Sequence, residues 1–389
     1  MPMIYLDNNA TTAMDPKVVE VIAGCLRNGP ANASSQHAMG RHARAAMDEA
    51  IESVASCLGG DSRAVDGDRV IITSGGTEAN NLAIRGLGNA HGELVASAIE
   101  HPSVLSALRS LSASRKINLL PVDSSGVVRL DALAETLSRK QASQTPLSVV
   151  SVMSANNETG VIQPMEAIGR LCADHDVAFH VDATQSIGKV PVDVMRWQAS
   201  AVTITPHKFH GPCGVGFLWL RRGASIRPLL RGGEQQLESR PGTEPLALVL
   251  GASEALRIAI ESQSETHARM LGLRERFETG LRRLGRPLEI HAVDADRLPN
   301  TTCVSFPGRD RQALLMSLDL AGIACSSGSA CSSGSSRPSH VLSAMGLSRE
   351  LVESAIRFGL SRFSTEPEID EAVSVLSRVL GRESRFSTC

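Results

Sequence analysis

The chain has 389 residues, 42% of them hydrophobic, which is enough to fill the cores of two or three domains. Its formal net charge of -2 at pH 7 gives no support to a nucleic-acid or anionic-membrane partner, because both partners need a basic excess. The longest apolar runs, such as VGFLWL, are too short to cross a bilayer.

The cysteines and the first residues favour a cytoplasmic protein. Eight cysteines lie along the chain without a CxxC pair or a metal-ligand spacing. A chain of this size does not need a disulfide scaffold, so we expect a reducing compartment in which few thiols react. The start, MPMIYLDNNATT, lacks a basic segment followed by an apolar one, so no signal peptide is expected.

In chain order, short apolar runs alternate with amphipathic helical patterns. The order of strand, turn and helix is expected in four segments: residues 68–86, 93–111, 146–176 and 177–188. This alternation predicts an α/β fold with a mostly parallel sheet between helices and functional residues at the carboxyl ends of its strands.

From about residue 255 the sequence changes character. A long helical stretch, residues 255–285, precedes a smaller region of mixed pattern. We therefore place a domain boundary near residue 255.

Two polar residues follow directly on predicted strands. Lys208, one of only five lysines, stands beside two histidines in the first turn after the strand SAVTIT. Asp182 ends the apolar strand VAFHVD, where a carboxylate needs a cation or hydrogen-bond donors. Taken singly, Lys208 is equally consistent with a structural lysine, and Asp182 is more typical of a helix cap.

A third feature is the segment TSGGTEANN, in which glycines after a strand lead into a helix. The free backbone N–H groups and the positive end of such a helix favour an anion. A lysine, an acid at a strand end and an anion cradle together match the needs of pyridoxal phosphate. The lysine forms a Schiff base, the acid keeps the pyridine nitrogen protonated, and the cradle binds the phosphate.

The sequence resembles the NifS/IscS-type cysteine desulfurases, which are fold-type I pyridoxal-phosphate enzymes of the class V aminotransferase group. The resemblance runs almost end to end through ordered motifs: YLDNNATT, TSGGTEANNLAI, AIEHPSVL, ANNETGVIQP, HVDATQSIGKVP, HKFHGPCGVGFLWLRRG, RPGTEP, SSGSAC and IRFGLSRF. It implies an α/β large domain, residues 15–255, with a mostly parallel seven-stranded sheet between helices. A smaller α+β domain, residues 1–14 and 256–389, would carry a mobile reactive-cysteine loop at about 322–337.

The resemblance also implies roles for single residues. Lys208 would hold the cofactor covalently, Asp182 would pair with the pyridine nitrogen, and His101 would stack on the ring and transfer protons. The phenolic oxygen would be contacted by Gln185 and Asn157. The phosphate would be bound by Gly76, Thr77, Thr205 and His207, and by Thr243 from the neighbouring subunit of a homodimer.

The substrate carboxylate would be bound by Arg357, whose guanidinium suits a bidentate contact, with Asn157 beside it. Family resemblance places the nucleophile at Cys331, in SSGSAC. Small residues around Cys331 suit a thiol that must move with its sulfur cargo. Cys325 follows the apolar LAGIA and is interpreted as a buried small hydrophobe.

The implied reaction converts L-cysteine to L-alanine and leaves the sulfur on Cys331 as a persulfide, for delivery to an iron–sulfur scaffold or another acceptor protein. No nucleic acid, membrane or metal is expected. A selenocysteine lyase or another class V enzyme is the nearest alternative, because the same site can break a C–Se bond. A sulfur-relay scaffold without activity is the alternative from another class.

Overall fold

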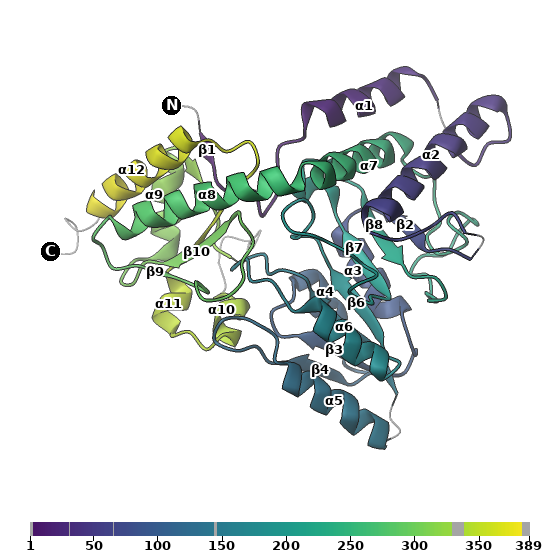
Figure 1. The fold of residues 1–389 in the computed structure, drawn as a ribbon, viewed down its shortest axis with the longest axis horizontal. Helices are drawn as coiled ribbons and strands as arrows, with labels where there is room; N and C mark the ends of the chain where they lie inside the picture. Colours follow the sequence, from purple (N-terminus) through teal and green to yellow (C-terminus); the bar gives the residue numbers. More distant parts are fainter. Residues whose placement is uncertain (1–2, 31, 65, 144–145, 329–337, 383–389) are drawn as a thin grey trace.

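The computed structural model describes residues 3–30, 32–64, 66–143, 146–328 and 338–382. A larger unit built around one broad sheet lies beside a smaller unit that contains both ends of the described chain (Figure 1). Two successive helices, α7 (Leu246–Glu261) and α8 (Gln263–Arg282), run from the larger unit to the smaller one.

The larger unit contains a seven-stranded sheet with the order β2-β8-β7-β6-β5-β3-β4. Its strands are β2 (Arg69–Thr73), β3 (Glu93–Ser97), β4 (Ile117–Leu120), β5 (Leu147–Met153), β6 (Ala178–Asp182), β7 (Ala201–Ile204) and β8 (Gly216–Leu220). All neighbours are parallel except β8, which is antiparallel to both β2 and β7. The prediction of a mostly parallel seven-stranded sheet is therefore confirmed.

Helices cover both faces of this sheet, which explains why its central strands are apolar on both sides. They are α1 (Pro16–Arg27), α2 (Ala38–Cys57), α3 (Gly76–Gly86), α4 (Pro102–Arg109), α5 (Leu130–Ser143), α6 (Met165–Asp174) and α7. Alternate residues of β2 enter different cores: Val70 and Ile72 face one side, and Ile71 packs on the other side with residues of α3 and α4.

The predicted order of strand, turn and helix is confirmed for three of its four segments: β2 with α3, β3 with α4, and β5 with α6. It is wrong for residues 177–188, where β6 is followed by turns. Gly188 there has a left-handed backbone with φ of +72°, and hydrogen bonds from Ser186 N to Ala183 O and from Lys189 N to Ser186 O close successive turns. The chain therefore forms successive turns after β6 instead of the expected helix.

The smaller unit has a core of its own. It contains β1 (Ile4–Tyr5), β9 (Glu289–Ile290), β10 (Thr301–Ser305), β11 (Ile323–Ala324), β12 (Ala355–Gly359), α8, α9 (Arg311–Leu320), α10 (His340–Ala344), α11 (Arg349–Glu353) and α12 (Glu366–Arg382). Strands β12, β10 and β9 form an antiparallel sheet, and β1 pairs in parallel with β11. In the core of this unit the rings of Phe277 and Phe358 pack edge to face, with centroids 5.0 Å apart.

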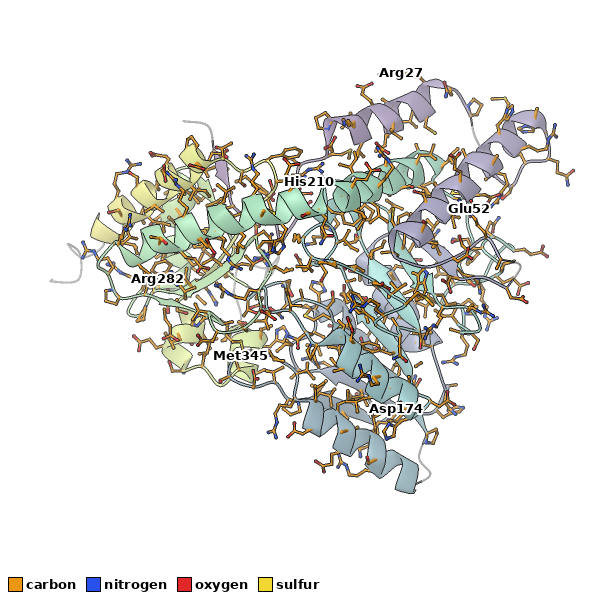
Figure 2. All side chains as sticks on the ribbon, viewed as in Figure 1. Arg27, Glu52, Asp174, His210, Arg282 and Met345 are labelled. Atoms are coloured by element: carbon orange, nitrogen blue, oxygen red, sulfur yellow. The ribbon has the colours of Figure 1, made fainter. Side chains whose placement is uncertain are left out.

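The long helical stretch after residue 255 is broken at Ser262. Helix α7 packs on α1 and α2, whereas α8 packs on α12, so the chain passes between the two cores at this break. His210, labelled in Figure 2, and Ser262 both line a small cavity at this break. The division into residues 15–255 and 1–14 with 256–389 stays a prediction.

Every helix in the described part of the chain is too short or too polar to cross a membrane.

Gly169 of α6 lies so close to Trp197 that a Cβ there would be 1.8 Å from the Trp197 carbonyl oxygen. We expect Gly169→Ala to lower the thermal midpoint, at a cost of about 1–3 kcal/mol, because a backbone atom cannot give way easily. A Cβ on Gly272 of α8 meets nothing within 4 Å. Gly272→Ala is the matched control, and it should raise stability by about 0.5–1 kcal/mol. A Gly169→Ala protein that melts like the wild type would contradict this packing.

Candidate active site

A cavity of about 370 Å³ lies at the carboxyl ends of the central strands of the large sheet. It is lined by ten of the residues singled out in the sequence: Gly76, Thr77, His101, Asn157, Asp182, Gln185, Thr205, His207, Lys208 and Arg357. Thr243 is exposed and is not among the lining residues. Cys331 lies outside the described residues. The structure therefore brings together all the described candidates except Thr243, while their roles stay predictions.

Lys208 ends a short 3-10 helix, Pro206–Lys208, that follows β7. Its Nζ atom donates hydrogen bonds to the carbonyl oxygens of Asn9, at 2.5 Å, and Ala10, at 2.6 Å. Burial, together with the nearby Arg357, lowers the pKa of Lys208 to about 8, although Asp7 and Asp182 oppose the shift. A substantial share of this amine is therefore neutral and nucleophilic at mildly alkaline pH.

Asp182 is the last residue of β6 and is only 5% exposed. Its Oδ1 accepts a hydrogen bond from the Thr184 backbone N–H at 3.0 Å, and its Oδ2 accepts one from Asn80 Nδ2 at 2.8 Å. Because no helix follows, Asp182 is not a helix cap. Two donors on a buried carboxylate compensate its lost hydration and leave it suited to a cationic ring nitrogen.

Helix α3 points its first turn into the cavity. Its N-cap residue, Gly75, has φ of +153° and supplies no side-chain cap. Glu78, the acidic residue of this first turn, forms an ion pair with Arg240 at 2.9 Å. The N–H groups of this turn are therefore suited to an anion, and Gly76, Thr77 and Thr205 line the cavity beside them. That these residues bind a phosphate stays a prediction.

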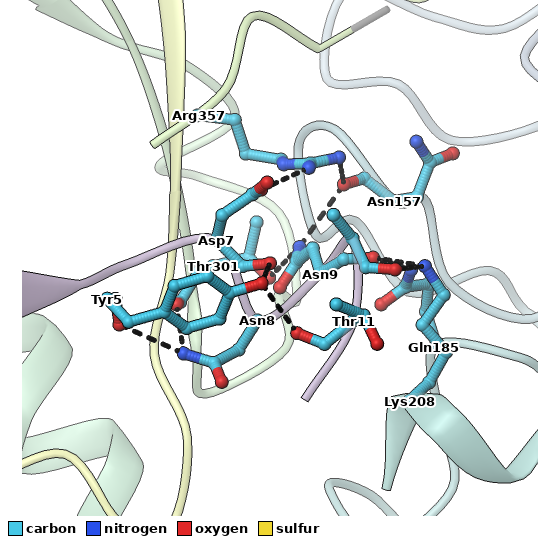
Figure 3. Close-up of polar contacts among 12 residues, drawn as sticks. Tyr5, Asp7, Asn8, Asn9, Thr11, Asn157, Gln185, Lys208, Thr301 and Arg357 are labelled. Carbon is cyan, nitrogen blue, oxygen red and sulfur yellow. Dashed lines mark hydrogen bonds and ion pairs between the residues drawn. The ribbon is translucent and has the colours of Figure 1, made fainter. Parts of the chain in front are cut away.

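Arg357, on β12, brings the smaller unit into the cavity (Figure 3). Its side chain is 4% exposed, and Nη2 lies 2.7 Å from Asp7 Oδ1. Nη1 donates to the Asn157 carbonyl oxygen at 3.1 Å. Nε has no hydrogen-bond partner among the described residues. The guanidinium is thus held in place on one side and retains donor capacity for a carboxylate.

The segment Asp7–Thr12 joins these groups, although the sequence assigned it no role beyond the motif YLDNNATT. Asn9 Nδ2 donates to Thr301 Oγ1 at 2.9 Å in the smaller unit. The Asn9 carbonyl oxygen accepts from Gln185 Nε2 at 3.0 Å in the larger unit, in addition to Lys208. Figure 3 shows this segment between Lys208 and Arg357.

Sequence reasoning also missed Glu158, a fully buried acid in the cavity wall whose burial raises its pKa. Ser339 donates its hydroxyl to Glu158 Oε2, and a Cβ on Gly328 would lie 2.0 Å from the same oxygen. Glu158 therefore contacts residues on both sides of 329–337. The only signal in the sequence was its place in ANNETGVIQP.

Cys325 packs against the core of the smaller unit, and burial raises its pKa to about 12. A thiol with such a pKa is almost wholly protonated at neutral pH and is a poor nucleophile. This agrees with its interpretation as a small hydrophobe, although the side chain is half-buried rather than buried.

Comparison with known proteins identifies the family. The family profile described as "Aminotransferase class-V" matches residues 4–372. The chain belongs to the class-V aminotransferase family. The chain is 39% identical over 386 residues to a cysteine desulfurase of Nostoc sp., covering 98% of this chain and 94% of that protein.

Solved structures agree with this assignment. A NifS-like protein from Rickettsia africae matches with a TM-score of 0.88 and 32% identity, over 97% of this chain and 99% of that one. The structure of SspA in complex with cysteine matches with a TM-score of 0.76 and 28% identity, over 93% and 99%. The predicted fold-type I architecture and the predicted membership of the NifS-type cysteine desulfurases are therefore confirmed.

We expect two lysines of this class-V enzyme to titrate far below the usual range of lysine. Burial and the proximity of Lys208 lower the pKa of Lys189 to about 7, and the pKa of Lys208 is about 8. In cofactor-free enzyme labelled at lysine 13Cε, two resonances should therefore shift between pH 6 and pH 9 as these amines lose their protons.

Lys208→Ala assigns one resonance and should raise the midpoint of Lys189, because it removes a neighbouring cation. Midpoints above pH 9.5 for both lysines would show that the amines are not desolvated.

Proposed function

We propose that this protein is a cysteine desulfurase that uses pyridoxal phosphate on Lys208 and converts L-cysteine to L-alanine. One observation carries the proposal. The same cavity is lined by a lysine with a lowered pKa, a hydrogen-bonded carboxylate, the first turn of a helix and an arginine whose Nε has no hydrogen-bond partner among the described residues. This combination suits a phosphorylated, cationic-ring cofactor together with an amino-acid carboxylate.

The residues of the cavity fit pyridoxal phosphate by their chemistry. Lys208 would attach the cofactor and Asp182 would face its ring nitrogen. Gln185 and Asn157 would contact the phenolic oxygen, and His101 would cover the ring. The phosphate would lie on the cradle formed by Gly76, Thr77, Thr205 and His207. When bound, the cofactor supplies an electron sink for charge that develops at the substrate Cα.

The substrate is selected by its carboxylate. Arg357 binds the carboxylate, while Asp7 and the Asn157 carbonyl hold the guanidinium in one orientation. Once its amine is free, Lys208 takes the Cα proton, a role for which a pKa of about 8 is well matched to the working pH. That a structural relative binds cysteine supports this choice of substrate.

Cys331 accepts the sulfur. Its thiolate attacks the substrate sulfur, a new S–S bond forms as the C–S bond breaks, and Cβ gains a proton. Cysteine and the Cys331 thiol thus become alanine and a persulfide, and the electron pair of the broken C–S bond stays on Cβ. The outer sulfur of the persulfide then passes to an acceptor protein such as an iron–sulfur scaffold in the cytoplasm, and the Cys331 thiol is regenerated.

The enzyme works as a homodimer in this proposal. Thr243 is exposed, close in the chain to Arg240, whose ion pair with Glu78 fixes this segment beside the start of α3. From this position Thr243 would reach the phosphate site of the neighbouring subunit.

Cys331→Ser tests the proposal. It should still bind cofactor and L-cysteine, but alanine release should fall by more than about 100-fold, because a serine hydroxyl is a poor nucleophile toward sulfur. Cys325→Ala is the matched control and should retain most activity. Alanine release and mass spectrometry after one turnover measure both effects.

Sulfur found on Cys325 of the Cys331→Ser protein, with alanine released at the wild-type rate, would overturn the assignment of the nucleophile. A wild-type enzyme that releases no alanine from L-cysteine would overturn the function.

A further inference from the structure

An unbroken series of hydrogen bonds leads from Asp182 to His101. Asn80 Nδ2 donates to Asp182 Oδ2 at 2.8 Å and to Ser103 Oγ at 2.9 Å. His101 Nδ1 lies 2.8 Å from Ser103 Oγ and 3.1 Å from the Ser103 backbone nitrogen. The residues come from β6, from α3 and from the first turn of α4, so three elements converge on the imidazole.

The direction of each hydrogen bond is fixed by its neighbours. A carboxylate only accepts, so the amide nitrogen of Asn80 must face Asp182, and its second hydrogen points to Ser103 Oγ. Since Ser103 Oγ accepts from Asn80, its own proton is free for His101. The Ser103 backbone N–H can only donate. His101 Nδ1 is therefore an acceptor for two donors and carries no proton.

We propose that Asn80 and Ser103 are positioning residues that hold His101 as the neutral tautomer with its proton on Nε2. In this resting state His101 presents an N–H donor to the cavity. Its Nε2 has no hydrogen bond within the described part of the chain, while the residue itself lines the cavity. This inference rests on the proposed function, because the cofactor ring is the expected occupant.

Neutral His101 is consistent with the charges around it. Although His101 is exposed at the cavity mouth, loss of solvent around its ring lowers its pKa, and Lys208, His340 and Arg357 lower it further, whereas Asp182 opposes them. Lys208 and Arg357 already supply two cations to this cavity. Protonation of Nδ1 would lose the hydrogen bond from the Ser103 backbone N–H and force the Ser103 hydroxyl to turn, which disfavours a third cation on His101.

The test is a 15N spectrum of cofactor-free enzyme labelled at histidine, with the His101 signals assigned by their loss in His101→Gln. We expect a protonated Nε2 and an unprotonated Nδ1 at neutral pH. Ser103→Ala removes one of two donors to Nδ1 and should raise the midpoint of His101 protonation by about half a pH unit or more.

Ser103→Thr keeps the hydroxyl and should restore the wild-type midpoint. Ser106→Ala, on an exposed part of the same helix, is the matched control and should change nothing. A proton on His101 Nδ1 in the wild type, or a Ser103→Ala spectrum identical to the wild type, would overturn the proposal.

These spectra require neither cofactor nor substrate. An enzyme that releases no alanine but shows the expected tautomer would therefore contradict the function alone. A wrong tautomer in an active desulfurase would contradict only this inference.

Discussion

The Lys208 amine and the Arg357 guanidinium are buried in one cavity, and a buried cation needs nearby oxygen atoms to replace its lost hydration. The segment Asp7–Thr12 supplies these oxygens: two carbonyls accept from Lys208, and Asp7 pairs with Arg357. Because β1, immediately before it, belongs to the smaller unit, the segment must cross between the two units to reach both cations. The relative position of cofactor lysine and carboxylate-binding arginine thus depends on this one stretch of backbone.

The need to satisfy buried polar groups also explains the hydrogen bonds around Asp182. Asp182 accepts hydrogen bonds from Thr184 and Asn80. Asn80 also donates to Ser103, whose hydroxyl contacts His101. The polar groups that line the cavity therefore orient one another. The donors and acceptors are arranged before any ligand binds, which reduces the reorganisation needed during the reaction.

The sequence predicts the parts of this site that depend on local pattern. An apolar strand that ends in a polar residue marks Asp182 and Lys208, and glycines before a helix mark the cradle at Gly76. Contacts between distant parts of the chain have no local sequence pattern. Asp7 and Arg357, for example, are 350 positions apart. Asn80 looks like any other polar residue of a helix. The helix expected after Asp182 failed for a different, local reason, because hydrogen bonds between residues three apart close successive turns there and Gly188 takes a left-handed backbone.

The most direct test of this account is to locate the cofactor attachment. Borohydride reduction of the holoenzyme followed by peptide mass spectrometry would identify the lysine that carries a phosphopyridoxyl group. The account predicts the modification on Lys208 and none on Lys189, whose amine is buried and donates to the Gln185 carbonyl at 2.8 Å. A phosphopyridoxyl group on Lys189, or on no lysine, would contradict it.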